Sequence, residues 1–263
     1  MHAAEREQLI LQLLQQRGFV AFQELDNQLD ASPATLRRDL DKLENSGRIV
    51  RVRGGARLAQ PAQPADEHDV QHLQGIPFHQ NLARNTERKR AIGRAAAELL
   101  RARESVIIDG GSTTLQMCPY LDALELQVLS NSLHIINALL GQPSTRIAIP
   151  AGTVFREQNI VLSPFDDDGM GGYRASRMFM GAAAVGRHGV MQADLILAQA
   201  ERRLLERADE LILLVDSSKF EAPAGHVVCA LDEVDAVITD ESIRPEHVKL
   251  LKEHGIKLVI AKG

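Results

Sequence analysis

The chain of 263 residues is 44% hydrophobic and 25% charged, a composition typical of soluble globular proteins, and its length suits one small and one medium-sized domain. Its net charge of −5 excludes a protein that binds polyanions over its whole surface. The sequence has no apolar run of about 18 residues and no signal peptide at its charged start, so we expect a cytoplasmic protein with no membrane partner. Its two cysteines are too few for a disulfide framework, so we expect reduced thiols.

Three short helices are predicted in the first 45 residues. Apolar residues one turn apart predict a helix over residues 4–16 and a second helix over residues 21–29. Ser32 is a favoured N-cap and Pro33 suits a first helical turn, so a third helix is expected to begin there. The apolar face of this third helix is formed by Leu36, Leu40 and Leu43.

A basic β-hairpin is predicted directly after the third helix. Side chains alternate over residues 48–53, and Gly54 and Gly55 provide a turn. Three helices with such a hairpin predict a winged helix-turn-helix domain over residues 1–57. Between residues 31 and 57 seven basic residues stand against three acidic ones, which is the charge pattern of a DNA-binding module within an acidic protein.

The third helix is the predicted recognition helix. Since its leucines point inward, Arg38 faces directly away from them. Outer residues near the start of such a helix contact base edges, and arginines of the hairpin suit the neighbouring backbone or minor groove. A three-helix domain that binds protein is the alternative. The predicted DNA contacts are Ser32, Thr35, Arg37, Arg38, Lys42, Arg51 and Arg53.

Residues 58–80 are predicted to form a linker, because prolines and glycines interrupt the helical pattern there. His68 and His72 are four residues apart beside acidic side chains, but the rest of a zinc motif is missing. The acidic residues 166–168 before Gly169 also lack the alternating spacing of a calcium loop. We therefore predict no metal site and no cofactor.

Residues 81–263 are expected to form one α/β domain. Helices are predicted around residues 92–99, 197–208 and 245–254. Short strands are predicted over residues 105–109, 126–129, 146–150, 210–215, 234–239 and 257–261. Strands that alternate with helices predict a mainly parallel sheet.

Polar turns follow three of these strands: Asp109–Thr114, Ser130–Ser132 and Asp216–Lys219. Ligands of open α/β sheets bind at the carboxyl ends of strands. Glycines let the backbone approach a ligand, hydroxyls supply hydrogen-bond donors, and Lys219 can pair with a phosphate or a carboxylate. Ordinary polar turns are the alternative, but three of them in one domain favour a pocket.

The chain resembles DeoR-family repressors in both of its parts. In the N-terminal part, the matching motifs are Gly18-Phe19-Val20, Ser32–Leu40, Leu43-Glu44, Gly47 and Arg53–Ala56. Over roughly residues 84–240, the sensor motifs of the family match Lys89, Asp109–Thr114, Asn131-Ser132, Gly152, Glu201, Asp216–Phe220 and Thr239-Asp240. The branch with the L-ascorbate utilisation repressor is most similar at Met178-Phe179, Gly189, Asp194 and Ala198–Glu201.

The resemblance implies a repressor of a sugar or sugar-acid catabolic operon that binds double-stranded operator DNA. It also implies a sensor with the fold of ribose-5-phosphate isomerase, which binds a phosphorylated sugar or sugar acid. The predicted effector-binding residues are Asp109, Gly110, Gly111, Ser112, Thr113, Thr114, Asn131, Gly152, Glu201, Asp216 and Lys219.

Two other functions remain open at this point. The first is a phosphosugar isomerase in which Asp109, Glu201 or Asp216 acts as the acid–base group. The second is a protein-interaction adaptor without DNA affinity. We predict a regulator with no catalytic residues, because an isomerase needs no helix-turn-helix module. One such module covers few base pairs, so we also expect a homo-oligomer, either a dimer or a tetramer.

Overall fold

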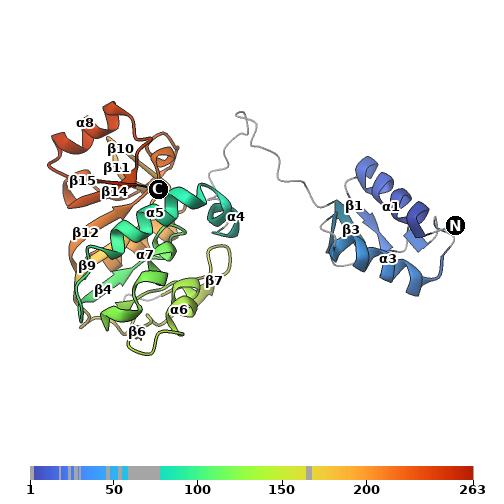
Figure 1. Cartoon of the computed structure of the whole chain (residues 1–263), viewed down its shortest axis with the longest axis horizontal. Helices are drawn as coiled ribbons and strands as arrows, with labels where there is room; N and C mark the ends of the chain where they lie inside the picture. The colour runs from blue at the N-terminus through green and yellow to red at the C-terminus, as the bar shows by residue number, and fades with distance from the viewer. Residues whose placement is uncertain are drawn as a thin grey trace. The chain divides into compact units, whose positions relative to one another are not determined.

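The computed structural model describes residues 3–17, 19–22, 25–26, 29, 31–45, 48–52, 55–58, 78–163 and 168–262. The described residues fall into two compact units (Figure 1), the N-terminal unit within residues 1–70 and the C-terminal unit within residues 71–263. In this described part, no helix is both long enough and apolar enough to cross a membrane.

The N-terminal unit contains the first and third predicted helices and the predicted hairpin. Its elements are α1 (Ala3–Arg17), β1 (Phe19–Ala21), α3 (Pro33–Asn45), β2 (Ile49–Val52) and β3 (Gly55–Leu58). The predicted second helix lies largely outside the described residues, although Phe22, Leu25 and Asp26 are helical. The three strands pair antiparallel in the order β1-β3-β2. The pairing of β1 with the hairpin was not predicted, because three residues are too few to show a period.

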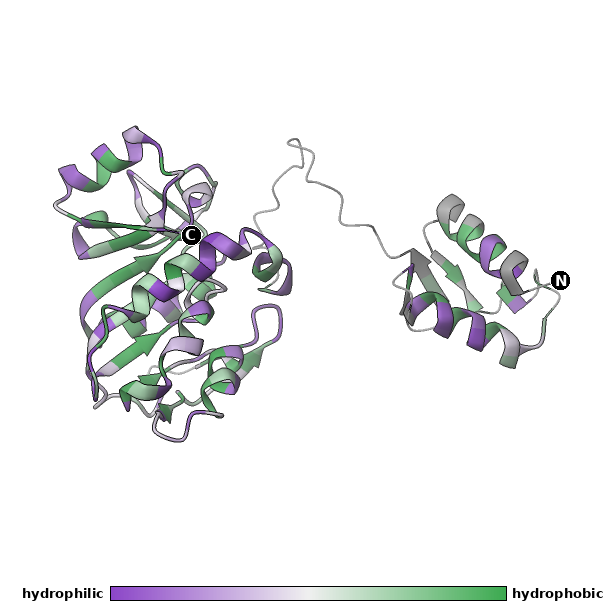
Figure 2. Cartoon of the chain, in the orientation of Figure 1, coloured by the Kyte–Doolittle hydropathy of each residue, from purple (hydrophilic) through white to green (hydrophobic). Residues whose placement is uncertain are grey.

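Helices α1 and α3 pack through an apolar core that is framed by buried acidic residues. Figure 2 shows α3 with alternating hydrophobic and hydrophilic bands, as the leucine spacing predicts. The core is formed by Ile10, Leu14, Val20, Leu25, Leu29, Leu36, Leu40, Leu43, Ile49 and Ala56. Asp39 is buried and pairs with Arg6 at 2.8 Å. The buried carboxylate of Glu7 pairs with Lys42 at 2.7 Å and with Arg48 at 3.0 Å.

The C-terminal unit is built on a seven-stranded sheet in the order β15-β14-β12-β9-β4-β5-β6. All six pairings in this sheet are parallel, which confirms the predicted mainly parallel sheet. Its strands are β4 (Ser105–Ile108), β5 (Gln127–Leu129), β6 (Arg146–Ala148), β9 (Ala175–Met180), β12 (Ala208–Leu214), β14 (Ala236–Asp240) and β15 (Lys257–Ala261). Its helices are α4 (Phe78–Ala83), α5 (Thr86–Ala97), α6 (Leu133–Leu139), α7 (Leu195–Leu205) and α8 (Pro245–Glu253).

Apolar layers cover both faces of this sheet, because successive side chains of a strand point to opposite faces. In β4, Val106 and Ile108 contribute to a core with α5 and α6. Ile107 between them contributes to a second core with α7 and α8. Figure 2 shows the middle of the sheet as largely hydrophobic, as expected for strands buried on both faces.

The central strand β9 was not predicted from the sequence. Its apolar pattern is interrupted by Ser176 and Arg177, which suggest an exposed turn. Arg177 instead lies within the sheet between two carboxylates, at 2.7 Å from Glu104 and 2.8 Å from Glu210. The partners that neutralise this arginine come from distant parts of the chain, so a local pattern does not reveal them.

Two antiparallel additions flank the main sheet. One is a hairpin of β7 (Thr153–Phe155) and β8 (Ile160–Leu162), and the other is a three-stranded sheet of β10 (Ala184–Gly186), β11 (Gly189–Gln192) and β13 (His226–Cys229). Gly189 has a φ of +113°, and a Cβ there would lie 2.2 Å from the carbonyl oxygen of Cys229. Only glycine therefore fits the turn that brings β11 against β13.

The two motifs that were weighed as metal sites fall mainly outside the described residues. These are His68 with His72, and the acidic residues before Asp168. Asp168 itself forms a two-pronged ion pair with Arg207, at 2.7 and 2.8 Å. This arginine lowers the carboxyl pKa of Asp168 against the effect of burial.

Candidate nucleic-acid interface and sensor site

The start of α3 is arranged as the sequence predicts. The backbone N–H of Thr35 donates to Ser32 Oγ at 3.2 Å, and the two hydroxyls lie 2.9 Å apart. Ser32 therefore caps the helix, and Pro33 occupies its first position. Leu36, Leu40 and Leu43 are buried while Ala34, Arg38 and Asp41 are exposed, which confirms the predicted inner and outer faces of α3.

The two arginines at the start of α3 differ in their surroundings. The guanidinium of Arg37 lies 5.5 Å from the ring centre of Phe22, and this contact orients its side chain. Arg38 is exposed and, within the described part of the chain, has no hydrogen-bonding or ionic partner. Arg38 is thus the cation on the outer face that is most available for a base or a phosphate.

The other predicted DNA contacts are less well defined by the structure. Lys42 is exposed but pairs with Glu7, so part of its charge is already neutralised. Arg51 lies in β2, but its side chain is not among the described atoms, and Arg53 lies outside the described residues. Their contacts with DNA stay predictions.

We expect Arg38→Ala to weaken specific DNA binding by about 1–3 kcal/mol, the usual value of one arginine that makes two hydrogen bonds to a base. Binding should be measured by titration with DNA from upstream of the protein's own gene and with unrelated DNA. Arg90→Ala removes an exposed arginine of α5 that pairs with Glu87 and serves as the matched control. Equal operator affinity in both variants would contradict a role of Arg38 in base recognition.

The three predicted polar turns meet at one edge of the main sheet. They follow β4, β5 and β12, and the order of strands places β12, β9, β4 and β5 next to one another. Because these strands are parallel, their carboxyl ends lie at the same edge. The structure thus brings together predicted residues that are more than one hundred positions apart in the chain.

The loop after β4 is held by the buried carboxylate of Asp109. Its Oδ1 accepts from Gly111 N–H at 2.9 Å and from the Thr114 hydroxyl at 2.8 Å, and its Oδ2 accepts from Gly181 N–H at 2.8 Å. Burial raises the pKa of Asp109, and these three donors oppose that effect. Asp109 and Thr114 therefore shape the loop, and their polar atoms are already used within the protein.

The glycines of this loop fit the protein's own side chains. A Cβ on Gly110 would lie 2.6 Å from Ile160 Cγ2, and one on Gly111 would lie 2.9 Å from Thr114 Oγ1. We predicted from the sequence that these glycines let the backbone approach a ligand. The contacts show that packing within the protein already requires glycine at both positions. The loop is followed by the 3-10 helix η1 (Thr114–Tyr120).

Lys89 is a central residue of this site that was matched to a family motif but omitted from the predicted effector contacts. Its side chain is buried, and its ammonium donates to Ser112 Oγ at 3.0 Å, to Asn81 Oδ1 at 3.2 Å and to the carbonyl oxygen of Asn81. Desolvation lowers the pKa of Lys89 to about 8, although Asp216 opposes this effect. A lysine on the inner face of α5 is the sequence signal that could have identified it.

In the turn after β12, one carboxylate oxygen of Asp216 is occupied, and the ammonium of Lys219 is unpaired among the described residues. Asp216 Oδ1 accepts from Asn85 Nδ2 and from the backbone N–H of Ser218, both at 3.1 Å, so it caps the following turn. The backbone N–H of Lys219 donates to the carbonyl oxygen of Asp216 at 3.0 Å, but its ammonium makes no hydrogen bond or ion pair with any described residue. Desolvation lowers the pKa of Lys219; Asp216 opposes that shift and Arg84 adds to it.

Two buried oxygens at the site have no hydrogen-bond partner among the described residues, and they belong to Asn131 and Glu201. In the turn after β5, Ser132 caps α6 by accepting from Ile135 N–H at 3.4 Å. Of this turn, Asn131 is therefore the residue left with an available polar atom. Gly152 differs, because a Cβ there would lie 2.2 Å from the Leu162 carbonyl oxygen; its contact is with the β8 strand.

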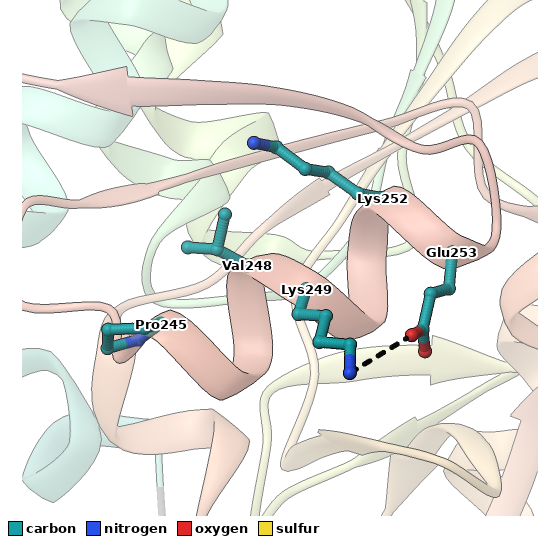
Figure 3. A pocket seen from close by; sticks show the side chains of 5 residues that line it. All are labelled: Pro245, Val248, Lys249, Lys252 and Glu253. Carbon is teal, nitrogen blue, oxygen red and sulfur yellow. Dashed lines mark ion pairs between the residues drawn. The ribbon is translucent and has the colours of Figure 1, made fainter.

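One surface hollow, of about 450 Å³, is not at this edge of the sheet. Figure 3 shows that its lining side chains all project from α8, with Lys249 paired to Glu253 and Lys252 extended to the other side of the helix. It gathers no buried polar groups, so it does not have the chemistry of a sensor site. A smaller cavity of about 20 Å³ between Asn131 and α7 has room for about one water molecule.

One cluster of side chains has the ligand types of a metal site. Ligand atoms of Glu221, Glu246 and His247 lie within 4.8 Å of one another. Arg244 is 2.8 Å from Glu221 and 3.7 Å from Glu246. Because this cation already pairs with both carboxylates, the cluster is explained as an ion-pair network.

Comparison with protein families shows matches in both units. Residues 6–62 match the DeoR-like helix-turn-helix domain, and residues 84–241 match the DeoR C terminal sensor domain. The second match spans more than half of the chain. The two matched ranges contain the Arg38 face and the carboxyl edge of the main sheet, respectively.

Curated relatives match over nearly the whole chain. The chain is 31% identical over 259 residues to the HTH-type transcriptional regulator UlaR of Shigella dysenteriae serotype 1 (strain Sd197). This alignment covers 98% of this chain and 99% of that protein. The identity and coverage are the same for UlaR of Escherichia coli (strain SMS-3-5 / SECEC).

Among solved structures, ribose 5-phosphate isomerase A of Methanocaldococcus jannaschii aligns with a TM-score of 0.39 and 16% identity, covering 52% of this chain and 55% of that one. The enzyme from Neisseria gonorrhoeae aligns with a TM-score of 0.36 and 17% identity, covering 52% and 54%.

Proposed function

Since the chain belongs to the DeoR family of transcriptional regulators, we propose that it represses a sugar or sugar-acid catabolic operon and is released from its operator by a phosphorylated effector. The N-terminal unit binds double-stranded DNA through α3. The effector binds at the carboxyl edge of the main sheet, between the loop after β4 and Lys219.

The observation that supports a phosphorylated effector is a group of three cations at this edge. Lys219 and Arg84 both act on Lys89 so as to lower its pKa, which means that the three charges repel one another. Asp216 is the carboxylate that opposes this repulsion at both lysines. Asp216 is itself occupied by Asn85 and Ser218.

A bound phosphate relieves this repulsion. Desolvated ammonium groups favour a nearby anion strongly, because screening by water is reduced. Ser112 lies beside Lys89 and supplies a hydroxyl next to the two charges. An unphosphorylated sugar has no group that compensates the three cations, so we expect it to bind much more weakly.

A regulator is favoured over an isomerase-like enzyme by the relatives, which are named as transcriptional regulators over their full length. The exposed outer face of α3 also has a direct use in a DNA-binding protein. We propose that the protein acts in the cytoplasm as a dimer or a tetramer, because one helix-turn-helix unit contacts few base pairs.

Induction requires that the effector bind the DNA-free state more tightly than the DNA-bound state. A coupling of about 1–3 kcal/mol changes the operator affinity about 5- to 150-fold. This range is enough to move a repressor from mostly bound to mostly free.

We expect Lys219→Ala to bind operator DNA normally but to lose its response to phosphorylated sugars, which gives constitutive repression. The reason is that the substitution removes an unpaired charge of the effector site and leaves α3 intact. DNA titrations should be run with and without ribose 5-phosphate, glucose 6-phosphate and 6-phosphogluconate, on DNA from upstream of the protein's own and neighbouring genes.

Lys252→Ala is the matched control, since it removes an exposed lysine from the hollow on α8. If the Lys219 variant still releases DNA at the same effector concentration as the wild type, Lys219 lies outside the site. Loss of the response in the Lys252 variant alone would move the effector to the hollow on α8.

A further inference from the structure

Glu201 on α7 has one occupied and one unoccupied carboxyl oxygen. Its Oε1 accepts from Gln192 Nε2 at 2.6 Å. Its Oε2 is enclosed and has no hydrogen-bond partner among the described residues. An enclosed polar atom without a partner costs free energy, so this oxygen is positioned for a group that the protein itself does not supply.

The charges around Glu201 disfavour a carboxylate. Burial raises its pKa well above the usual value, and the negative charge of Asp109 adds to this effect. Cys229, on β13 beneath α7, is the other titratable group with which Glu201 interacts. Arg203, two positions along the helix, lines the small cavity beside Asn131 and Asp168.

The neighbouring carboxylate cannot share the task of binding a ligand. Both oxygens of Asp109 are already occupied by donors from Gly111, Thr114 and Gly181. A ligand that reaches Glu201 therefore meets a single available oxygen. A ligand carboxylate at this place would lie beside the charge of Asp109.

We propose that Glu201 binds the effector as an uncharged carboxylic acid and donates one hydrogen bond from Oε2 to a hydroxyl or carbonyl oxygen. This inference rests on the proposed sensing function and specifies its ligand class. The effector carries its negative charge on the phosphate, at Lys89 and Lys219, and presents an uncharged oxygen at Glu201. Phosphorylated aldonic acids, which carry a second negative charge, are accordingly the disfavoured class.

The first test compares ligands that differ in one group. Binding of glucose 6-phosphate and 6-phosphogluconate to the full chain should be measured by calorimetry, together with ribose 5-phosphate and 5-phosphoribonate. We expect the better of the two neutral sugar phosphates to bind about tenfold or more tightly than its charged counterpart, as for an unmatched buried charge.

The second test examines the protonation of Glu201 directly. Infrared difference spectra should show a protonated carboxyl band that is present in the wild type, shifts when the neutral sugar phosphate binds, and is missing in Glu201→Gln. Because glutamine also donates from this position, Glu201→Gln should keep the affinity for the neutral ligand within about threefold, whereas Glu201→Ala should lose about tenfold or more. Glu206→Gln, at the exposed end of α7, is the matched control.

The outcomes separate this inference from the proposed function. If charged counterparts bind as tightly as neutral ones, if the band is absent from the wild type, or if Glu201→Gln loses about tenfold in affinity, the uncharged role of Glu201 is wrong and the sensing function stands. If no phosphorylated compound of any class binds the wild type, both the inference and the proposed function are overturned.

Discussion

Between pH 7 and pH 9.5 the free energy of unfolding of the C-terminal unit should rise by about 2 kcal/mol more in the wild type than in a Lys89→Met variant. Lys89 is buried without a contacting carboxylate, and desolvation lowers its pKa from 10.5 to about 8. At a pH between these two pKa values, Lys89 therefore keeps its proton in the unfolded chain but has released it in the folded chain. Because the unfolded state binds more protons in this window, stability rises with pH, by about 3 kcal/mol over the full window.

Urea unfolding followed by tyrosine fluorescence can measure this gain. The two tyrosines, Tyr120 and Tyr173, both lie in the C-terminal unit, so the signal does not include the N-terminal unit. Methionine keeps the length of the side chain and removes the charge. The hydrogen bonds that it loses to Asn81 and Ser112 do not titrate, so they cancel when two pH values are compared. Parallel pH profiles of the two proteins would show that Lys89 keeps an ordinary pKa.

Leu40→Ala should unfold much of the N-terminal unit. Leu40 is 1% exposed and lies between Leu36 and Leu43 in the core shared by α1 and α3. Truncation of a buried leucine costs about 2–5 kcal/mol. This cost is comparable with the entire stability of a domain of this size. We therefore expect DNA binding to fall in proportion to the folded fraction.

Hydrogen exchange followed by mass spectrometry can monitor each unit in the intact protein. Peptides from α3 should lose protection in Leu40→Ala, while peptides from α5 stay protected. Leu9→Ala makes the same change at a position of α1 that is 40% exposed, and it should cost less than about 1 kcal/mol. Full protection of α3 in the Leu40 variant would mean that the apolar face of this helix is not its main support.

The sequence predicts those elements whose own residues determine them. The period of Leu36, Leu40 and Leu43 with the cap at Ser32 predicts α3, and runs such as Ser105–Ile108 predict buried strands. It does not predict β9, because Arg177 is acceptable in a sheet only beside Glu104 and Glu210. Helix α6 could have been predicted, since Ser132 caps a segment with Ile135, Ile136 and Leu139 on one face.

For the sensor site, the sequence predicts which residues meet but not what each of them does. Polar turns after parallel strands must share an edge, and Asp109, Asn131 and Lys219 accordingly lie at the same edge of the sheet. Whether a polar atom is free for a ligand depends on its partners in the folded chain. Asp109 and Thr114 are occupied by each other, and Lys89 became recognisable as part of the site only through its burial.

The parallel sheet also sets an order of events during synthesis of the protein. The core strand β4 pairs with β9, about 70 residues later in the chain, and β9 in turn pairs with β12. Such distant pairings form slowly, whereas helical units with local contacts fold early. During synthesis, the α1–α3 unit is therefore expected to fold outside the ribosome well before the sheet that senses the effector is complete. For that interval, the growing polypeptide holds a DNA-binding surface to which no metabolite signal is yet connected.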